Sequence, residues 1–276
     1  MPKKRSRPLR TLTVAAAVII CVAVGGYLIN RHIVLLTNGC ESDGGGRVIM
    51  LDTDQAAIAA TIAGVAHSRR LPTHAVTIAY ATAWQESHLH DPDYGTSDSV
   101  GVFQQRPSEG WGTPQQLINP VYAAGAFFAA LVKVPDYLNI PIYEAAQDVQ
   151  HSADGSAYMN YEQQAASMSG SFTGGTPHAV WCWFPQNSTK GPQITPLQKE
   201  LTRTFGRLDV RRDAVSSTVS IDRSAAGWTV ASWLVTHATT YGITSVRYAG
   251  YQWSLSAGNR GWTRDPSAPR DSVELR

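Results

Sequence analysis

The stretches Ala81-Thr-Ala-Trp-Gln-Glu-Ser-His-Leu89 and Gly101-Val-Phe-Gln-Gln-Arg-Pro107 decide how this chain folds. The first closes a run of small and apolar side chains, residues 74–87, at helical spacing. A single carboxylate, Glu86, therefore stands at the end of a helix and at the edge of a core. The second stretch is expected to form a turn or short strand that brings two glutamines to the same cleft.

Further helix signals lie on both sides of this centre. Aspartates within residues 52–54 can cap a first helix, which Leu71-Pro72 would end, and Thr73 is expected to cap the next one. Thr113-Pro114 and Asn119-Pro120 each place proline after a capping residue, at the first helical position. Further helices are expected over residues 121–132, 141–153, 158–169, 197–205 and 227–241, and short strands over residues 244–248, 251–255 and 272–275.

The order of these elements predicts two domains. A mainly α domain is expected over residues 52–186, and a linker containing Gly and Pro over residues 187–196. A small α+β domain is expected over residues 197–276. Residues 30–51, which include three consecutive glycines, are expected to form a flexible spacer before the first domain.

With these motifs in order, residues 55–170 resemble a lytic transglycosylase domain of the lysozyme superfamily, of the actinobacterial type. The resemblance covers roughly two fifths of the chain and rests on Gln85-Glu86-Ser87, the Gly-x-Phe-Gln segment and the helix that Asn-Pro begins. It implies a lysozyme-like fold, bacterial peptidoglycan strands as the partner, and Glu86 as the acid that protonates the leaving glycosidic oxygen. The carboxylate would then act as base while the muramic acid 6-hydroxyl attacks its own anomeric carbon.

The expected surroundings of Glu86 suit this role, because a carboxyl beside an apolar wall loses hydration when it ionises, and its pKa rises. The alternative is an ordinary solvated carboxylate at a helix end. Hydrolysis would need a second carboxylate; Asp98 is the best placed in sequence, followed by Asp91 and Asp93, although each is also an ordinary loop residue. The residues expected to bind sugar are amides and aromatics: Gln104, Gln105, Tyr94, Trp111, Gln147 and Gln150.

The charge distribution argues against a nucleic-acid partner. The formal net charge is +2, but six of the 23 Lys and Arg lie in residues 1–31, which contain no acid. The remaining 17 basic residues face 21 acidic ones, so the body of the chain is about four units negative. Nucleic-acid-binding domains usually carry a strongly basic patch.

Residues 11–29 carry no charge, and as a helix they would be roughly 28 Å long, enough for a hydrocarbon core of ~30 Å. The basic flank at residues 1–10, with Arg31 after the span, predicts a cytoplasmic N-terminus. The chain is thus expected to cross the cytoplasmic membrane once, by a transmembrane signal anchor, with an extracytoplasmic body. A cleaved signal peptide, which would give a secreted protein, is the alternative.

Cys40 and Cys182 make an even pair in the part of the chain expected outside the membrane. An oxidising compartment favours a disulfide between them. Cys21 lies inside the expected span, and two unpaired thiols are the alternative.

The C-terminal stretches Gly227-Trp-x-x-Ala-x-Trp-Leu-Val and Tyr241-Gly-Ile-Thr-x-Val-Arg-Tyr resemble a domain found behind actinobacterial wall hydrolases. That domain is similar in outline to metal-dependent DD-peptidases of the Hedgehog-like fold. Asp222 matches a ligand of that family, but Asp271-Ser-Val-Glu-Leu stands where an Asp-His-Val-His motif is expected. Because both histidines are missing, we expect no catalytic zinc and a binding or spacer role.

The loop His88-x-His90-Asp91-x-Asp93 matches no helical or closed zinc pattern, so neither a metal nor a cofactor is expected. The sequence thus favours a membrane-anchored enzyme, a lytic transglycosylase or muramidase, that cleaves peptidoglycan with Glu86 as general acid and base. The alternative is a catalytically inactive protein, of lysozyme-like fold, that binds or organises the cell wall. A metal-handling module at this loop is the third hypothesis.

Overall fold

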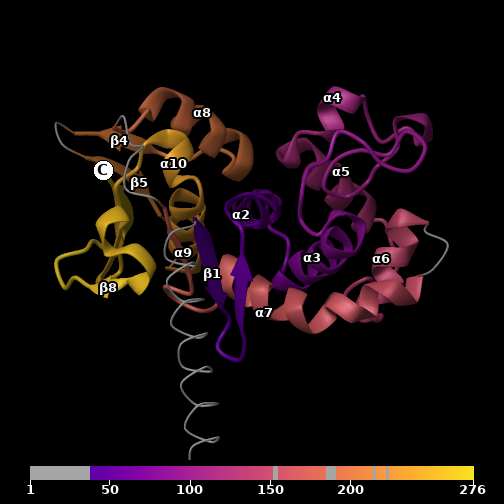
Figure 1. Ribbon diagram of the computed structural model, residues 1–276, viewed down its shortest axis with the longest axis horizontal. Helices are drawn as coiled ribbons and strands as arrows, with labels where there is room; N and C mark the ends of the chain where they lie inside the picture. The colour runs from indigo at the N-terminus through magenta and orange to yellow at the C-terminus, as the bar shows by residue number, and fades with distance from the viewer. Residues whose placement is uncertain (1–37, 152–154, 185–190, 214–215, 222–223) are drawn as a thin grey trace, which may run out of the picture. The chain divides into compact units, whose positions relative to one another are not determined.

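The computed structural model of the protein describes residues 38–151, 155–184, 191–213, 216–221 and 224–276 (Figure 1). The expected membrane span and part of the expected linker lie outside the described residues. No helix within the described ranges is long and apolar enough to cross a membrane. Residues 39–276 group into one compact unit, about half helical, with two antiparallel sheets. The expectation of a mainly α fold is therefore met only in part.

Helices α2 (Thr53–Ser68) and α3 (Thr73–Ser87) form the apolar centre of the first half. The start of α2 is confirmed by a capping box, in which Gln55 N donates to Asp52 Oδ1 at 2.8 Å and Asp52 N donates to Gln55 Oε1 at 3.0 Å. Such a box satisfies two amides that a helix start leaves free. The expected cap by Thr73 is wrong, because Pro72 holds the cap position and no side chain caps α3.

Helix α3 is surrounded by the helices that follow it (Figure 1). It packs against α5 (Pro120–Leu131), α6 (Ile142–Gln150), α7 (Glu162–Phe172) and the 3₁₀ helix η2 (Gly155–Tyr161).

Both expected helix starts that contain proline are confirmed. Thr113 Oγ1 accepts a hydrogen bond from Gln116 N, and Asn119 Oδ1 accepts one from Tyr122 N. The single helix expected over residues 158–169 is two elements, η2 and α7. The bounds are η1 (Pro107–Glu109), α4 (Pro114–Leu117), α5 (Pro120–Leu131), α6 (Ile142–Gln150), η2 (Gly155–Tyr161) and α7 (Glu162–Phe172).

Residues 39–51 form two strands, which corrects the expected spacer. Strands β1 (Gly39–Asp43), β2 (Val48–Leu51) and β3 (Val180–Trp183) pair antiparallel in the order β2-β1-β3. The glycines after Asp43 make the turn, and Gly45 has a φ of +83°, which suits a residue without Cβ. The strand β2 alternates exposed and buried side chains, as expected of a strand with one face on a core.

The register of this sheet places Cys40 opposite Cys182, and the two form the expected disulfide. It spans 142 residues of sequence, so it joins the first strand to the strand that follows the helical region.

The second half is an antiparallel six-stranded sheet in the order β4-β5-β9-β6-β7-β8. The three expected strands are confirmed as β6, β7 and β9, and α9 covers one face of β6 and β9. Gly227 of α9 allows this contact, because a Cβ there would lie 2.1 Å from the Tyr248 ring. The bounds are α8 (Ile194–Phe205), β4 (Val210–Arg212), β5 (Ser217–Ser220), α9 (Ser224–Thr236), α10 (Ala238–Tyr241), β6 (Ser245–Tyr248), β7 (Tyr251–Ser254), η3 (Leu255–Arg260), β8 (Thr263–Arg264) and β9 (Ser272–Leu275).

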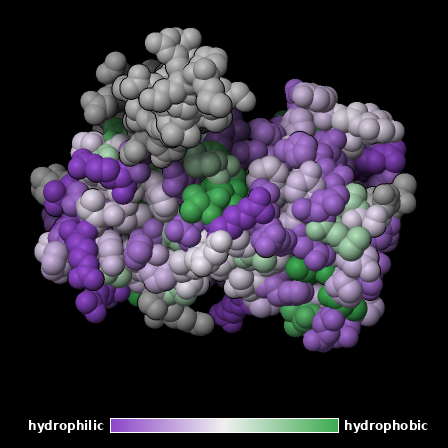
Figure 2. Space-filling model, turned by 60° about the horizontal axis from the view of Figure 1, so that its bottom comes forward, coloured by the Kyte–Doolittle hydropathy of each residue, from purple (hydrophilic) through white to green (hydrophobic). Residues whose placement is uncertain are grey.

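Helix α2 also packs against α8 and α9, so the buried apolar residues of both halves belong to one cluster. The surface is different in character. The face drawn in Figure 2 is largely hydrophilic, with small apolar patches between polar side chains.

His237, between α9 and α10, predicts how stability depends on pH. Its ring stacks on Trp233 with centroids 3.9 Å apart, and burial lowers its pKa to about 4. In the unfolded chain its pKa is about 6.5. The folded state therefore gains stability from the neutral imidazole, and this contribution is fully present above pH ~6.5. It is lost as the pH falls towards 4, and the free energy of unfolding should decrease by up to about 3 kcal/mol.

The measurement is urea unfolding between pH 7.5 and 4.5 for the wild type and His237→Phe. Phenylalanine keeps the stacking and removes the titrating group, so all other pH effects are shared. We expect the wild type to lose stability relative to the variant as pH falls. Parallel pH curves would contradict the assignment.

Candidate functional site

A groove of about 940 Å³ lies between the end of α3, the loop of residues 96–106 and the end of α6. Glu86, in the last turn of α3, is one of its lining residues. The helix ends at His88, whose φ is 54°, and Ser87 Oγ donates to Val102 O at 2.8 Å. That bond ties the end of the helix to the glycine-containing turn, so Glu86 and the turn face one groove.

The Glu86 carboxyl is largely buried and has two hydrogen-bond donors. Tyr158 Oη donates to Glu86 Oε1 at 2.6 Å, and the Gln150 side chain also bonds to the carboxyl. Burial raises the pKa of Glu86 and outweighs these two bonds, which lower it. Gln150 is itself fixed, since its Nε2 donates to Phe103 O at 2.7 Å. The arrangement holds a carboxyl in a defined position, and this carboxyl keeps its proton to a higher pH than an exposed glutamate does.

The turn after Val100 forms as expected. Val100 and Gln105 make an isolated β-bridge, and Gly101 has a φ of +79°. A Cβ at Gly101 would lie 2.2 Å from Leu117 O, so only glycine fits there. The turn places Gln104 and Gln105 on the groove.

The two glutamines differ in their contacts. Gln104 Oε1 accepts from Ser99 Oγ at 3.0 Å, which fixes the side chain at the groove wall. Gln105 is 2% exposed, and its Oε1 has no hydrogen-bond partner among the described residues. A buried acceptor without a donor is costly. The Gln105 residue lines the groove, but its Oε1 is itself buried.

The other expected sugar-binding residues divide into two groups. Trp111 and Gln150 line the groove. Tyr94, which is 76% exposed, does not line the groove. Gln147 does not line it either, and its Oε1 lies so close to Gly155 that a Cβ added there would be 2.8 Å away.

Asp98 is held by its neighbours. Its Oδ1 accepts from Arg106 Nε at 2.9 Å and its Oδ2 from Ser108 N at 2.8 Å. These bonds lower the pKa of Asp98 to about 2, so it is ionised. It does not line the groove, whereas Arg106 does. These contacts brace the loop, and a direct catalytic part for Asp98 stays a prediction.

Asp91 and Asp93 also lie outside the groove lining. Burial raises the pKa of Asp91 to about 7, although the Val102 amide donates to it. His90 Nε2 lies 3.0 Å from Asp52 Oδ2, and both side chains are exposed. The described residues contain no group of three side chains suited to a metal ion.

Sequence reasoning missed Tyr158, His151, Ser99, Arg106 and Glu109, all of which contact Glu86 or line the groove. Tyr158 carries the clearest role, but it belongs to η2, 72 residues after Glu86. No local pattern marks it, because its pairing with Glu86 arises when α6 and η2 pack against α3.

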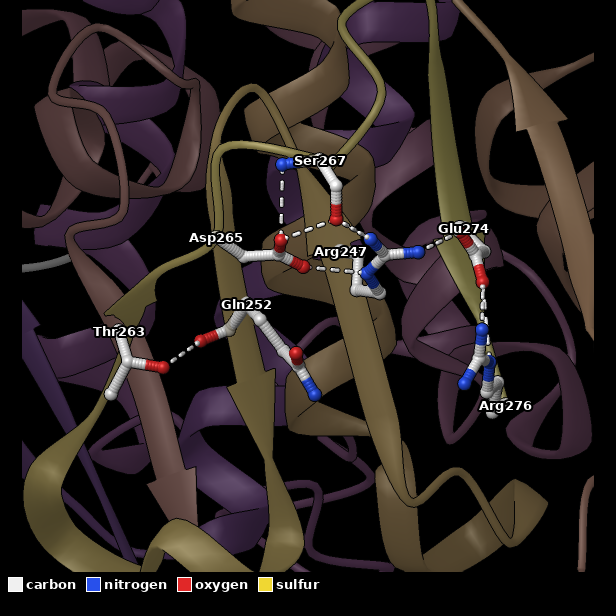
Figure 3. Close-up of polar contacts among 7 residues, drawn as sticks. All are labelled: Arg247, Gln252, Thr263, Asp265, Ser267, Glu274 and Arg276. Atoms are coloured by element: carbon white, nitrogen blue, oxygen red, sulfur yellow. Dashed lines mark hydrogen bonds and ion pairs between the residues drawn. The ribbon is translucent and has the colours of Figure 1, made fainter.

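The sheet of the second half carries a separate charged network, drawn in Figure 3. The Arg247 guanidinium lies between the carboxylates of Asp265, at 2.7 Å, and Glu274, at 2.5 Å. Arg247 Nη2 also donates to Ser267 Oγ. Glu274 belongs to the terminal segment in which the resemblance to DD-peptidases would require a metal-binding histidine, and it pairs there with Arg247. Asp222, which matches a metal ligand of that family, lies outside the described residues.

Comparison with protein-family models and with curated proteins finds no match for this chain.

Replacement of Tyr158 by phenylalanine provides a test of how Glu86 is held. The variant removes a bond that lowers the pKa of Glu86, so that pKa should rise further. Under the sequence-based hypothesis that the protonated Glu86 cleaves peptidoglycan, the alkaline limb of the rate profile should move to higher pH. Under the same hypothesis the rate should fall about tenfold, the value of one hydrogen bond to a charged group. A pH–rate profile on purified cell wall measures both effects, and a lower rate with an unmoved alkaline limb would mean that Tyr158 acts only on the structure.

Proposed function

We propose that this protein is a peptidoglycan-cleaving enzyme of lysozyme-like fold, with Glu86 as general acid and then general base. The observation that carries the proposal is the Glu86 carboxyl, which is largely buried, has a raised pKa and opens on a groove of about 940 Å³. A carboxyl with a raised pKa keeps its proton to a higher pH than an exposed glutamate does, and a protonated carboxyl can donate to a glycosidic oxygen. The groove is at the upper end of the size typical of ligand sites, as an oligosaccharide requires.

The contacts around Glu86 support an order of events. The protonated carboxyl donates to the oxygen that leaves, and the carboxylate that remains is stabilised by Tyr158 and Gln150. In the second step this carboxylate removes the proton of an attacking hydroxyl. Gln104 and Gln105 line the groove and are proposed to hydrogen-bond the N-acetyl or hydroxyl groups of the substrate.

We further propose that the attacking hydroxyl belongs to the substrate, as in a lytic transglycosylase. Hydrolysis requires a second carboxylate near the sugar. Glu109 lines the groove but is paired with Arg106 at 2.6 Å, and Asp98 is paired with the same arginine. Both are committed to an ion pair, which favours intramolecular attack over activation of water.

The location proposed for this enzyme is the outer side of the cytoplasmic membrane, with residues 11–29 as the anchor. Support comes from the uncharged span with its basic flank and from the Cys40–Cys182 disulfide, since disulfides persist in oxidising compartments. The second half is proposed to be non-catalytic, because the two histidines of the expected metal-binding motif are missing and Glu274, in the same terminal segment, pairs with Arg247.

The test is incubation of the full chain with purified cell wall and identification of the products by mass. Anhydromuramic ends are expected from intramolecular attack, and new reducing ends would instead show a muramidase. Wall binding without new ends of either kind would show an inactive binding or scaffold protein and would overturn the proposal.

A further inference from the structure

A second cavity, of about 280 Å³, shares no lining residue with the groove of Glu86. It lies where the three-stranded sheet meets the segment between η3 and β8. We call it the aromatic cavity and define it by Asp43, His178, Trp181, Arg260, Gly261 and Trp262. Residues far apart in the sequence thus form one site.

Two indoles form its apolar walls. Trp262 is fixed, since its Nε1 donates to Val180 O at 2.7 Å and its ring packs edge-on against Trp228. Trp181 extends from β3 beneath Gly261. A Cβ at residue 261 would lie 3.0 Å from the Trp181 ring, and Gly261 has a φ of +67°. Glycine therefore keeps clear a space over the indole that any other residue would occupy.

The cavity has two charged side chains of opposite sign, Asp43 and Arg260. Asp43 Oδ1 accepts from Gly45 N at 3.0 Å, and Arg260 Nε donates to Ala257 O at 3.1 Å. Within the described parts of the chain, neither side chain has an ion-pair partner. The His178 ring packs against Tyr251, with centroids 4.3 Å apart and the ring planes tilted by 32°, and burial lowers the pKa of His178, which favours its neutral form.

These features select a neutral, hydrogen-bonding ligand. An anion would meet Asp43 and a cation would meet Arg260, whereas a neutral polar ring can use both. A pyranose has an apolar C–H face that fits an indole and equatorial groups that donate and accept hydrogen bonds. The volume lies just below that of sites for drug-sized ligands, ~300–1,000 Å³, which suits a single ring.

We propose that the aromatic cavity is a second, non-catalytic site that binds one pyranose unit of a glycan. The ligand class rests on the lining of the cavity itself. That the pyranose belongs to cell-wall glycan rests on the proposed function. Such a site would hold the enzyme on a strand while the groove cleaves elsewhere.

The experiment is calorimetric titration of the full-length Glu86→Gln protein with the tetramer of N-acetylglucosamine. A polyoxyethylene detergent is used, because it carries no sugar headgroup. We expect two sites per chain. Asp43→Asn combined with Arg260→Gln should weaken one site at least tenfold, and Gly261→Ala should do the same by filling the space over Trp181. Trp111→Ala should weaken the other site, because Trp111 lines the groove.

The matched control changes the same residue types in an exposed ion pair at the start of β4, Asp209→Asn with Arg211→Gln, and should retain both sites. The proposal is overturned if the cavity variants bind two tetramers with unchanged affinity, or if the only site found is abolished by Trp111→Ala. Displacement by a wall stem peptide that carries no sugar would overturn the ligand class. If the wild type cleaves no glycan while the cavity variants lose a site, the proposed function fails and this site stands.

Discussion

Glu86→Gln should lower glycan cleavage about a hundred- to ten-thousandfold while the protein still folds and binds cell wall. General acid catalysis by a positioned side chain contributes this much, and glutamine cannot donate the proton. Its carbonyl can still accept from Tyr158 Oη, the bond that Glu86 Oε1 makes at 2.6 Å. Because burial raises the pKa of Glu86, an uncharged amide suits the site, and no loss of stability is expected. The measurement is the release of soluble muropeptides from purified wall, with urea unfolding beside it.

Glu109→Gln is the matched control, because it makes the same chemical change in the same groove. Glu109 is exposed and paired with Arg106 at 2.6 Å, and exposed ion pairs contribute about 0–1 kcal/mol. We expect cleavage within about threefold of the wild type, little more than the rate equivalent of such a pair. If both variants lost the same fraction of cleavage activity, Glu86 would be no more important for cleavage than Glu109. Unchanged cleavage by Glu86→Gln would contradict the proposed mechanism.

Much of the helical frame could be predicted from local chemistry. The starts at Asp52, Thr113 and Asn119 follow from short side chains that accept from amides two or three residues later, and this chemistry depends on sequence neighbours alone. The position of Glu86 in the last turn of α3 was predictable for the same reason, since an apolar helical run precedes it.

Features that depend on distant partners could not be predicted in the same way. The glycines after Asp43 resemble a spacer until β1 is paired with both β2 and β3. The hydroxyl of Tyr158 reaches Glu86 only because two elements far apart in sequence pack together. The place of Asp98 in the sequence suggests a second catalytic carboxylate. In the structure Asp98 accepts hydrogen bonds from Arg106 and Ser108, and sequence spacing alone does not reveal these partners.

Removal of the disulfide, by Cys40→Ala with Cys182→Ala, should lower the free energy of unfolding by about 5 kcal/mol. In the chain-entropy model the cost grows with the closed loop, and here the bridge spans 142 residues. Both cysteines are buried opposite one another in the sheet, so alanine leaves strand pairing intact. Urea unfolding of the two proteins measures the difference.

Reduction of the wild type supplies an independent version of the same change. The reduced wild type and the double variant should unfold at similar urea concentrations, and reductant should not affect the double variant. Cys21→Ala is the control, because Cys21 lies outside the bridged pair, and it should retain the stability and the sensitivity to reductant of the wild type. A loss below about 1 kcal/mol in the double variant would mean that pairing of β1 with β3 already restricts the unfolded chain, since residual structure there reduces what a bridge contributes.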